Sequence, residues 1–137
     1  MTPYSGSGVS RTVLVVDDEP AVRSVICRLL EEWDFRVLEA GNGEEALRLA
    51  KEVRGNLALV VTDVLMPVMD GYEFARTFRP LHPNVPILFI TGHRPKALDA
   101  MTKKGEQLLF KPFGPDAFLE TVGRLLESRV NASRTSA

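Results

Sequence analysis

Cysteine and histidine are scarce in this chain of 137 residues, which has one cysteine, Cys27, and two histidines, His82 and His93. A single cysteine cannot close a disulfide within the chain, which favours a reducing compartment. We expect Cys27 to be a small core residue on a helix and both histidines to be loop residues. The chain also lacks the clusters of histidine and cysteine that zinc sites use.

Long apolar runs and an excess of charge of one sign are missing as well. No segment has the length of apolar residues that spans a bilayer, and residues 1–10 lack the basic start and apolar run of a signal peptide. A formal net charge of -1 argues against binding to nucleic acid or to a membrane surface through overall positive charge. With 45% hydrophobic and 26% charged residues, we expect one soluble, cytoplasmic domain.

Composition changes along the chain predict its domain organisation. Residues 1–10 include Ser5-Gly6-Ser7-Gly8 and predict a flexible leader, and residues 130–137 predict a flexible tail. Between them, residues 11–129 alternate short apolar runs with longer amphipathic stretches, which is typical of an α/β domain with helices on both faces of a parallel sheet. The five predicted strands are 13–16, 36–39, 57–61, 87–90 and 107–110.

Apolar spacing and helix-starting residues predict the helices. Asp18 is a candidate cap, Pro20 suits a first helical turn, and the apolar residues after them repeat at three- and four-residue spacing. This predicted buried face consists of Val22, Val25, Ile26, Leu29, Leu30 and Trp33. The second and third helices begin at pairs that resemble capping boxes, Asn42 with Glu45 and Asp70 with Glu73.

The last two helices differ in the strength of their apolar faces. A fourth helix, from about 95 to 104, has only a small apolar face, and we expect it to be the most mobile. The fifth has a clear stripe of Phe118, Leu119, Val122, Leu125 and Leu126. Too few residues follow it for a DNA-binding output module, so we expect no direct binding of nucleic acid.

Polar residues follow four of the predicted strands at the point where each strand ends. Asp17 and Asp18 follow the first strand, Asp63 the third, Thr91 the fourth and Lys111 the fifth. In an open parallel α/β sheet the ligand site lies beyond the carboxyl ends of the strands. The sequence therefore predicts that three carboxylates, one hydroxyl and one ammonium group meet at one end of the sheet.

Three neighbouring carboxylates repel one another and raise one another's pKa values, so the cluster predicts a bound cation. Mg²⁺, or Mn²⁺ in its place, fits because such an ion prefers oxygen ligands and takes one or two protein carboxylates together with a phosphate oxygen. With the charge screened, one carboxylate can attack phosphorus and form an acyl phosphate. The metal and the lysine then offset charge on the transferring oxygens, and the hydroxyl can bond one of them.

Four segments resemble, in order and in spacing, the successive motifs of CheY-like response-regulator receiver domains. They are Val13-Leu14-Val15-Val16-Asp17-Asp18-Glu19, Thr62-Asp63-Val64-Leu65-Met66-Pro67-Val68-Met69-Asp70-Gly71, Ile90-Thr91-Gly92 and Phe110-Lys111-Pro112-Phe113. The resemblance covers nearly the whole folded region. It implies a flavodoxin-like (βα)₅ fold, a doubly wound five-stranded parallel sheet with strand order 2-1-3-4-5.

For the phosphoryl group, the resemblance implies that Asp63 is the phosphoacceptor, Thr91 the switch hydroxyl and Lys111 the phosphate partner. The family also tends to hold the peptide bond after this lysine in cis, which Pro112 permits. The implied function is two-component or phosphorelay signal transduction, in which phosphorylation changes the surface of the domain. We expect chemistry of the protein on itself, not an enzyme that acts on metabolites.

For the metal, the resemblance implies Asp18 and Asp63 as direct ligands and Asp17 as a ligand that acts mainly through water. The backbone carbonyl of Leu65 would complete the protein's share of the shell. Leu65 also lies where side chains of the family control the access of water to the acyl phosphate, and its apolar character predicts slow loss of the phosphoryl group.

The implied partners are a histidine kinase or histidine phosphotransfer protein and a downstream protein. The downstream protein would bind the face formed by residues 95–104, 107–110 and the last helix. We expect a monomer or weak dimer with no membrane contact. Two departures affect this face: Leu108 replaces the usual aromatic residue three positions before the lysine, and the span from Thr91 to Lys111 is slightly short.

Several alternatives stay open from the sequence. The chain could be the receiver portion of a hybrid histidine kinase or a larger regulator. A Mg²⁺-dependent phosphohydrolase is more remote, because Leu65 stands where the best-known such family has a second aspartate. A nucleotide or flavin carrier would need a glycine-rich phosphate loop, which Asp17-Asp18-Glu19-Pro20 replaces. Taken singly, each site residue could also be an ordinary cap, strand end or surface charge.

Overall fold

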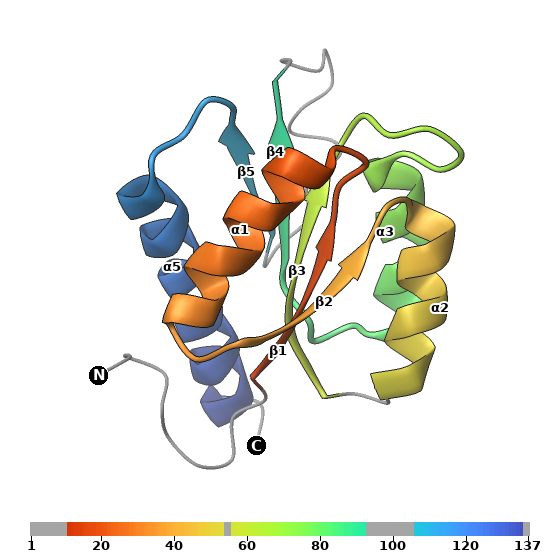
Figure 1. Ribbon diagram of the computed structural model, residues 1–137. Coiled ribbons are helices and arrows are strands. Elements are labelled where there is room, and N and C mark those ends of the chain that lie inside the picture. Colours follow the sequence, from red (N-terminus) through yellow and green to blue (C-terminus); the bar gives the residue numbers. More distant parts are fainter. Residues whose placement is uncertain (1–10, 54–55, 93–105, 136–137) are drawn as a thin grey trace.

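The computed structural model describes residues 11–53, 56–92 and 106–135, and its centre is one parallel sheet (Figure 1). All neighbouring strands pair in parallel in the order β2-β1-β3-β4-β5, which confirms the predicted fold class and topology. The strands are β1 (Thr12–Val16), β2 (Arg36–Ala40), β3 (Leu57–Asp63), β4 (Ile87–Thr91) and β5 (Glu106–Phe110).

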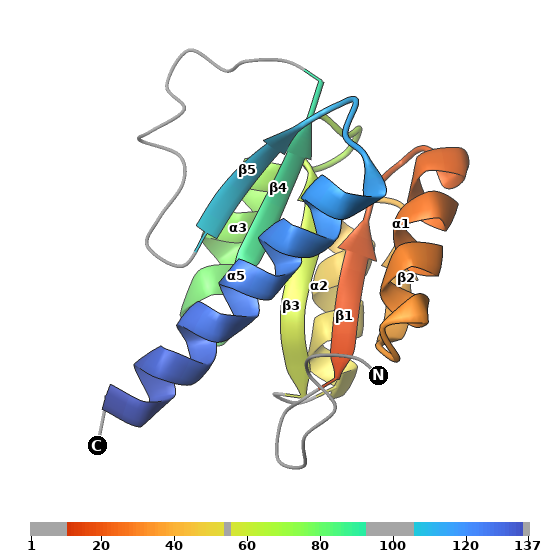
Figure 2. The ribbon, with the colours of Figure 1, turned by 90° about the vertical axis from the view of Figure 1, so that its left-hand side faces the viewer.

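Helices cover both faces of this sheet. Helices α1 (Pro20–Glu32) and α5 (Pro115–Thr135) lie on one face, and α2 (Gly43–Val53) and α3 (Gly71–Leu81) lie on the other (Figures 1 and 2). Because successive strand residues point to opposite faces, Val13 and Val15 pack towards α1 and α5, whereas Leu14 and Val16 pack towards α2 and α3. Two apolar cores therefore hold the strand ends in fixed positions.

Strand β3 occupies the middle of the sheet, and all seven of its residues are buried. A central parallel strand is covered on both faces, which explains its continuous apolar sequence. The run ends with the polar pair Thr62 and Asp63, which are 0% and 6% exposed. The fold thus holds one carboxylate at the buried end of its central strand.

Helix α1 departs from the sequence prediction at two residues. Its N-cap is Glu19, without a side-chain hydrogen bond, so Asp18 is not the cap that it resembles in the sequence. The carboxylate of Asp17 instead accepts a hydrogen bond from the backbone N–H of Glu19. Val25 is 57% exposed, although we placed it on the buried face, because it lies at the border of a stripe whose centre is Ile26 and Leu30.

The predicted starts of α2 and α3 are confirmed in different degrees. Asp70 and Glu73 form a complete capping box. At α2 the backbone N–H of Glu45 donates to the side chain of Asn42, but the Glu45 carboxylate accepts from the N–H of Gly41 instead of Asn42. The capping box of α2 is therefore only half formed, because the Glu45 side chain binds the N–H of Gly41, the residue before the cap.

Helix α5 buries its predicted apolar stripe and then continues to Thr135, past the Arg129 at which we expected the folded region to end. No glycine or proline follows Gly123, so the sequence has no residue that would stop the helix earlier. The predicted leader and the predicted fourth helix lie outside the described residues. No helix in the described ranges is both long and apolar enough to cross a membrane.

Two of the scarce residues noted in the sequence, Cys27 and His82, belong to helices or helix ends and are not members of the carboxylate cluster. Cys27 is a core residue of α1, as predicted, and burial together with nearby Glu39 raises the pKa of its thiol to about 12. His82 follows α3, where its ring stacks on Phe78 at a centroid distance of 4.6 Å. His93 lies outside the described residues.

Candidate functional site

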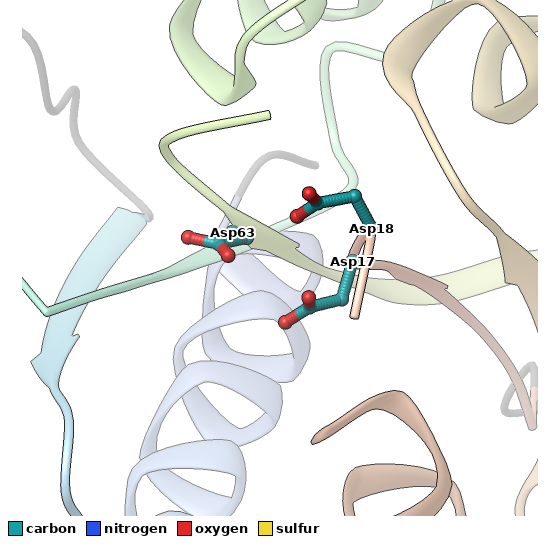
Figure 3. A group of neighbouring side chains, drawn as sticks. All are labelled: Asp17, Asp18 and Asp63. Atoms are coloured by element: carbon teal, nitrogen blue, oxygen red, sulfur yellow. The ribbon is translucent and has the colours of Figure 1, made fainter. Parts of the chain in front are cut away.

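Three carboxyl groups gather where β1 and β3 end (Figure 3). Asp17 and Asp18 follow β1, and Asp63 is the last residue of β3. They come together because β1 and β3 are paired, with Val16 opposite Thr62. One carboxylate oxygen from each residue lies within 4.8 Å of the other two. The predicted cluster is therefore present.

Asp17 is the most buried member of the cluster, with 1% of its surface exposed. Its Oδ1 accepts from the N–H of Glu19 at 2.9 Å, whereas its Oδ2 accepts no hydrogen bond from the described residues. Burial raises the pKa of Asp17, and the nearby charge of Asp63 adds to this effect. A buried carboxylate oxygen without a donor is a suitable ligand for a hard cation.

Lys111 brings the positive charge that the sequence predicted. Its Nζ lies 3.2 Å from Oδ2 of Asp63 and donates a hydrogen bond to it, and it lies 3.6 Å from Oδ2 of Asp17. Burial alone would lower the pKa of Lys111, but the two carboxylates outweigh burial and raise it. The ammonium group therefore stays protonated beside the cluster.

The peptide backbone ties the ends of β4 and β5 to the same place. The N–H of Lys111 donates to the carbonyl of Thr91, and the Lys111-Pro112 peptide bond is cis, as the resemblance implied. Thr91 is 1% exposed and follows Ile90, the residue paired with Asp63. Leu65 lies in the loop after β3 with 55% of its surface exposed. All the predicted site residues thus lie at one end of the sheet.

Two residues that the sequence analysis did not single out support this site. Gly71 begins α3 against the end of β3, where its N–H donates to the carbonyl of Val64 at 2.8 Å. A Cβ atom on Gly71 would lie 2.3 Å from the backbone oxygen of Asp63. Arg23 of α1 donates to the backbone carbonyl of Asp17. Gly71 follows a helix cap and ends the second of the four motif segments, whereas no sequence signal was evident for Arg23.

The arrangement suits the binding of a cation and a phosphoryl group together. The carboxylates of Asp17, Asp18 and Asp63 provide oxygen ligands, and their accumulated charge favours a divalent ion. Lys111 can offset negative charge on phosphoryl oxygens near Asp63. Zinc is disfavoured because this cluster contains neither histidine nor cysteine.

Comparison with protein families agrees with the resemblance seen in the sequence motifs. A model of the response regulator receiver domain matches residues 13–123, which is most of the chain. The sensor kinase CckA of Brucella abortus is 39% identical over 132 residues, 93% of this chain but 13% of that protein. The transcriptional regulatory protein SrrA of Staphylococcus aureus is 33% identical over 86% of this chain and 48% of its own length. This chain thus spans less than half of each of these relatives.

Solved structures agree with the sequence relatives. The chemotaxis protein CheY4 of Vibrio cholerae is 32% identical, with a TM-score of 0.79 over 86% of this chain and 100% of its own. The receiver domain of the hybrid histidine kinase CckA is 37% identical, with a TM-score of 0.74 over 84% of this chain and 98% of its own. Together with the family match, these similarities show that the chain belongs to the response regulator receiver domain family and is a receiver domain of two-component signalling.

Proposed function

We propose that Asp63 is the phosphoacceptor and takes its phosphoryl group from a phosphohistidine of a histidine kinase or histidine phosphotransfer protein. The observation that carries this proposal is the 3.2 Å contact between Lys111 Nζ and Asp63 Oδ2, beside the carboxylates of Asp17 and Asp18. A nucleophilic carboxylate, a fixed cation and a divalent-ion site are the parts that phosphoryl transfer to an aspartate needs.

The reaction is a displacement at phosphorus. A carboxylate oxygen of Asp63 attacks the phosphorus atom, the P–N bond of the phosphohistidine breaks, and the imidazole nitrogen leaves with the electron pair and becomes protonated. The product is an acyl phosphate on Asp63. The phosphoryl group is later lost by hydrolysis. Water attacks phosphorus and gives up a proton to solvent, the bond between phosphorus and the Asp63 oxygen breaks, inorganic phosphate leaves, and the Asp63 carboxylate is regenerated.

Mg²⁺ is the proposed cofactor, with Mn²⁺ as a substitute. Asp18 and Asp63 would bind it directly, Asp17 mainly through water, and Leu65 through its backbone carbonyl. The Oδ2 of buried Asp17 supports the fit, because this oxygen accepts no hydrogen bond from the described residues and has only the longer ion-pair contact with Lys111. When bound, the ion supplies positive charge that offsets the transferring phosphoryl oxygens.

Lys111 has two tasks in this proposal. Before transfer, its ammonium group orients Oδ2 of Asp63 through the hydrogen bond between them. After transfer, it can pair with a phosphoryl oxygen, since such charge-assisted bonds are stronger than neutral ones. Its raised pKa keeps the proton on Nζ throughout the physiological range.

The output follows from Thr91, whose hydroxyl would bond a phosphoryl oxygen and shift the end of β4. Two residues before Thr91, Phe89 of β4 is paired with Leu108 of β5, a partly buried residue that packs against the core on the α2 and α3 side. A shift at Thr91 would therefore reach the surface near β5 through an aliphatic residue. We propose that a downstream protein binds beside β5 and α5.

The setting of the receiver is a separate question from its chemistry. The relatives place receivers in a sensor kinase, a transcriptional regulator and a chemotaxis protein. The match to CckA favours the receiver of a hybrid kinase as the alternative setting. A phosphohydrolase is disfavoured because Leu65, two residues after Asp63, offers no acid or base.

Intact-mass measurement tests the proposed acceptor. The protein is incubated with Mg²⁺ and a small acyl-phosphate or phosphoramidate donor, in parallel with Asp63→Asn and with a sample in EDTA. We expect one labile phosphoryl adduct on the wild type and none on the variant or without metal. Beryllofluoride binding checks for rapid turnover where no adduct is found. A chain that neither forms the adduct nor binds beryllofluoride would not be a working phosphoacceptor.

A further inference from the structure

We propose that Arg23 is a positioning residue that sets the direction of the Asp17 carboxylate and thereby the affinity of the site for Mg²⁺. This inference rests on the proposed function, because it assigns a role toward the same metal site. Arg23 lies on α1, and its hydrogen bonds go to the Glu39 side chain and the Asp17 backbone carbonyl, not to the carboxylates of the cluster. It acts on Asp17 through the backbone.

Asp17 is held at three of its four hydrogen-bonding positions. Its N–H donates to the carbonyl of Ala40 on β2, and its Oδ1 accepts from the N–H of Glu19. Its own carbonyl accepts from Nη1 of Arg23 at 2.7 Å. These three bonds fix the peptide and the carboxyl plane, and the remaining oxygen, Oδ2, lies 3.6 Å from Nζ of Lys111.

Arg23 is the only side chain among these three partners. The other two bonds come from the backbone of Ala40 and Glu19 and survive any substitution that preserves the fold. The Arg23 contact is short and charge-assisted, a kind of bond that is stronger than an ordinary neutral one. Of the three hydrogen bonds that orient Asp17, the bond from Arg23 is therefore the one that a side-chain substitution can remove.

Arg23 is itself held by a second strand. Its Nε donates to Oε1 of Glu39 on β2 at 3.0 Å, while Nη1 reaches Asp17 after β1. The planar guanidinium can make both bonds at once, which a single ammonium point charge cannot do in the same fixed geometry. Only 21% of the Arg23 side chain is exposed, and its two hydrogen bonds hold the guanidinium between the ends of β1 and β2.

Positioning and simple electrostatics predict opposite effects of removing this charge. A nearby cation repels a divalent ion, so loss of the Arg23 charge alone would strengthen Mg²⁺ binding. Loss of the hydrogen bond to the Asp17 carbonyl would instead let the carboxylate turn away and weaken binding. Removal of groups that orient metal ligands typically lowers metal affinity by about 10- to 100-fold.

Calorimetric titration of the full unphosphorylated chain with Mg²⁺ separates these effects. The variants are Arg23→Gln, Arg23→Met, which keeps the length of the stem without donors, and Glu39→Gln, which leaves the Asp17 contact in place. Arg48→Gln is the charge control, because Arg48 is exposed and its recorded ion pair is with Glu52 on its own helix. Thermal unfolding in EDTA shows which variants are folded during the titration.

We expect both Arg23 variants to bind Mg²⁺ about tenfold or more weakly than the wild type. Glu39→Gln should change affinity much less, and Arg48→Gln should leave it unchanged or slightly tighter. Wild-type or tighter affinity in a folded Arg23 variant would overturn the positioning role while leaving the metal site intact. If the wild type itself bound no Mg²⁺, the proposed metal site would fall, and this role with it.

Discussion

At the scale of single residues, the three acidic side chains of the site differ in their surroundings. Asp17 and Asp63 are 1% and 6% exposed, whereas Asp18 is exposed to solvent. A buried carboxylate costs more to ionise than an exposed one. In the absence of a cation, the ionised carboxylate of Asp17 is therefore unfavourable and lowers the stability of the folded protein.

We predict that Asp17→Asn stabilises the metal-free protein. The pKa of Asp17 is raised above its ordinary value of 3.8, chiefly by burial, so the folded protein holds this proton more tightly than the unfolded chain does. Above the raised pKa the ionised group destabilises the fold. We therefore expect Asp17→Asn to have a higher free energy of unfolding than the wild type at pH 7 in EDTA.

The pH dependence of this gain follows from the same shift. As the pH falls through the raised pKa, folded wild-type protein takes up the proton, and the advantage of the variant shrinks. It disappears below the unfolded value near 3.8. Urea unfolding in EDTA at several pH values measures the difference. An asparagine variant that is less stable than the wild type at pH 7 would contradict this account of Asp17.

Leu65 gives a second prediction at the residue scale, about the lifetime of the phosphoryl group. Its apolar side chain lies in the loop after Asp63 and cannot orient an attacking water, whereas an amide can. We expect Leu65→Asn to lose its phosphoryl group several-fold faster once the donor is removed. Val68→Asn is the matched control, because Val68 is 70% exposed in the same loop. Equal decay in the wild type and Leu65→Asn would remove Leu65 from the mechanism.

At the scale of elements, the junction between β3 and α3 fixes the position of Asp63. Helix α3 begins so close to the end of β3 that a Cβ atom on Gly71 would lie 2.3 Å from the Asp63 carbonyl oxygen. Backbone cannot yield as a flexible side chain does. We predict that Gly71→Ala lowers the free energy of unfolding by about 1–3 kcal/mol, the usual cost of overpacking.

Gly114 is the control for this prediction, since nothing lies within 4 Å of the position that its Cβ would take. Gly114→Ala should change stability by less than about 0.5 kcal/mol or raise it slightly. Both variants are compared by urea unfolding. A Gly71 variant as stable as the Gly114 variant would show that α3 can move away from Asp63 without cost.

Strands β1, β3 and β4 were predictable from the sequence because a buried parallel strand is a continuous apolar run. Helix caps and the edges of buried helix faces were harder to predict, because they depend on how the backbone turns between elements. Asp18 resembled the cap of α1, but the turn after β1 brings Asp17 to the Glu19 N–H instead. Val25 matched the helical spacing, yet it falls at the border of the stripe and is 57% exposed.

The end of α5 shows a similar limit. Residues 131–137 are small and polar, which predicts a frayed tail, but the sequence has no glycine or proline after Gly123 that would stop the helix before Thr135. A composition argument concerns burial, whereas the helix end depends on local backbone propensity.

At the scale of the whole molecule, the site residues were predictable because topology does most of the placement. Strand order 2-1-3-4-5 puts the residues after β1, β3, β4 and β5 at one end of the sheet. Arg23 could not be found in this way, since its partners, Asp17 and Glu39, become neighbours only when β1 and β2 pair. Side chains that support a site from other elements can be identified only once the three-dimensional fold is known.

Metal binding should be visible in the stability of the whole domain. A ligand that binds only the folded state stabilises it by about 2.7 kcal/mol at a concentration 100 times its Kd. We predict that Mg²⁺ raises the unfolding temperature of the wild type, that Asp18→Asn abolishes most of this rise, and that NaCl of equal ionic strength does not reproduce it. Equal shifts in the wild type and Asp18→Asn would exclude Asp18 as a ligand.

The most direct test of the central claim is chemical identification of the phosphorylated residue. Borohydride reduces an acyl phosphate to an alcohol, so a phosphorylated aspartate becomes homoserine, which peptide sequencing by mass spectrometry can locate. After phosphorylation with Mg²⁺ and an acyl-phosphate donor, we predict homoserine at position 63 and unchanged aspartate at positions 17 and 18. Homoserine at either of those positions, with Asp63 intact, would contradict the account.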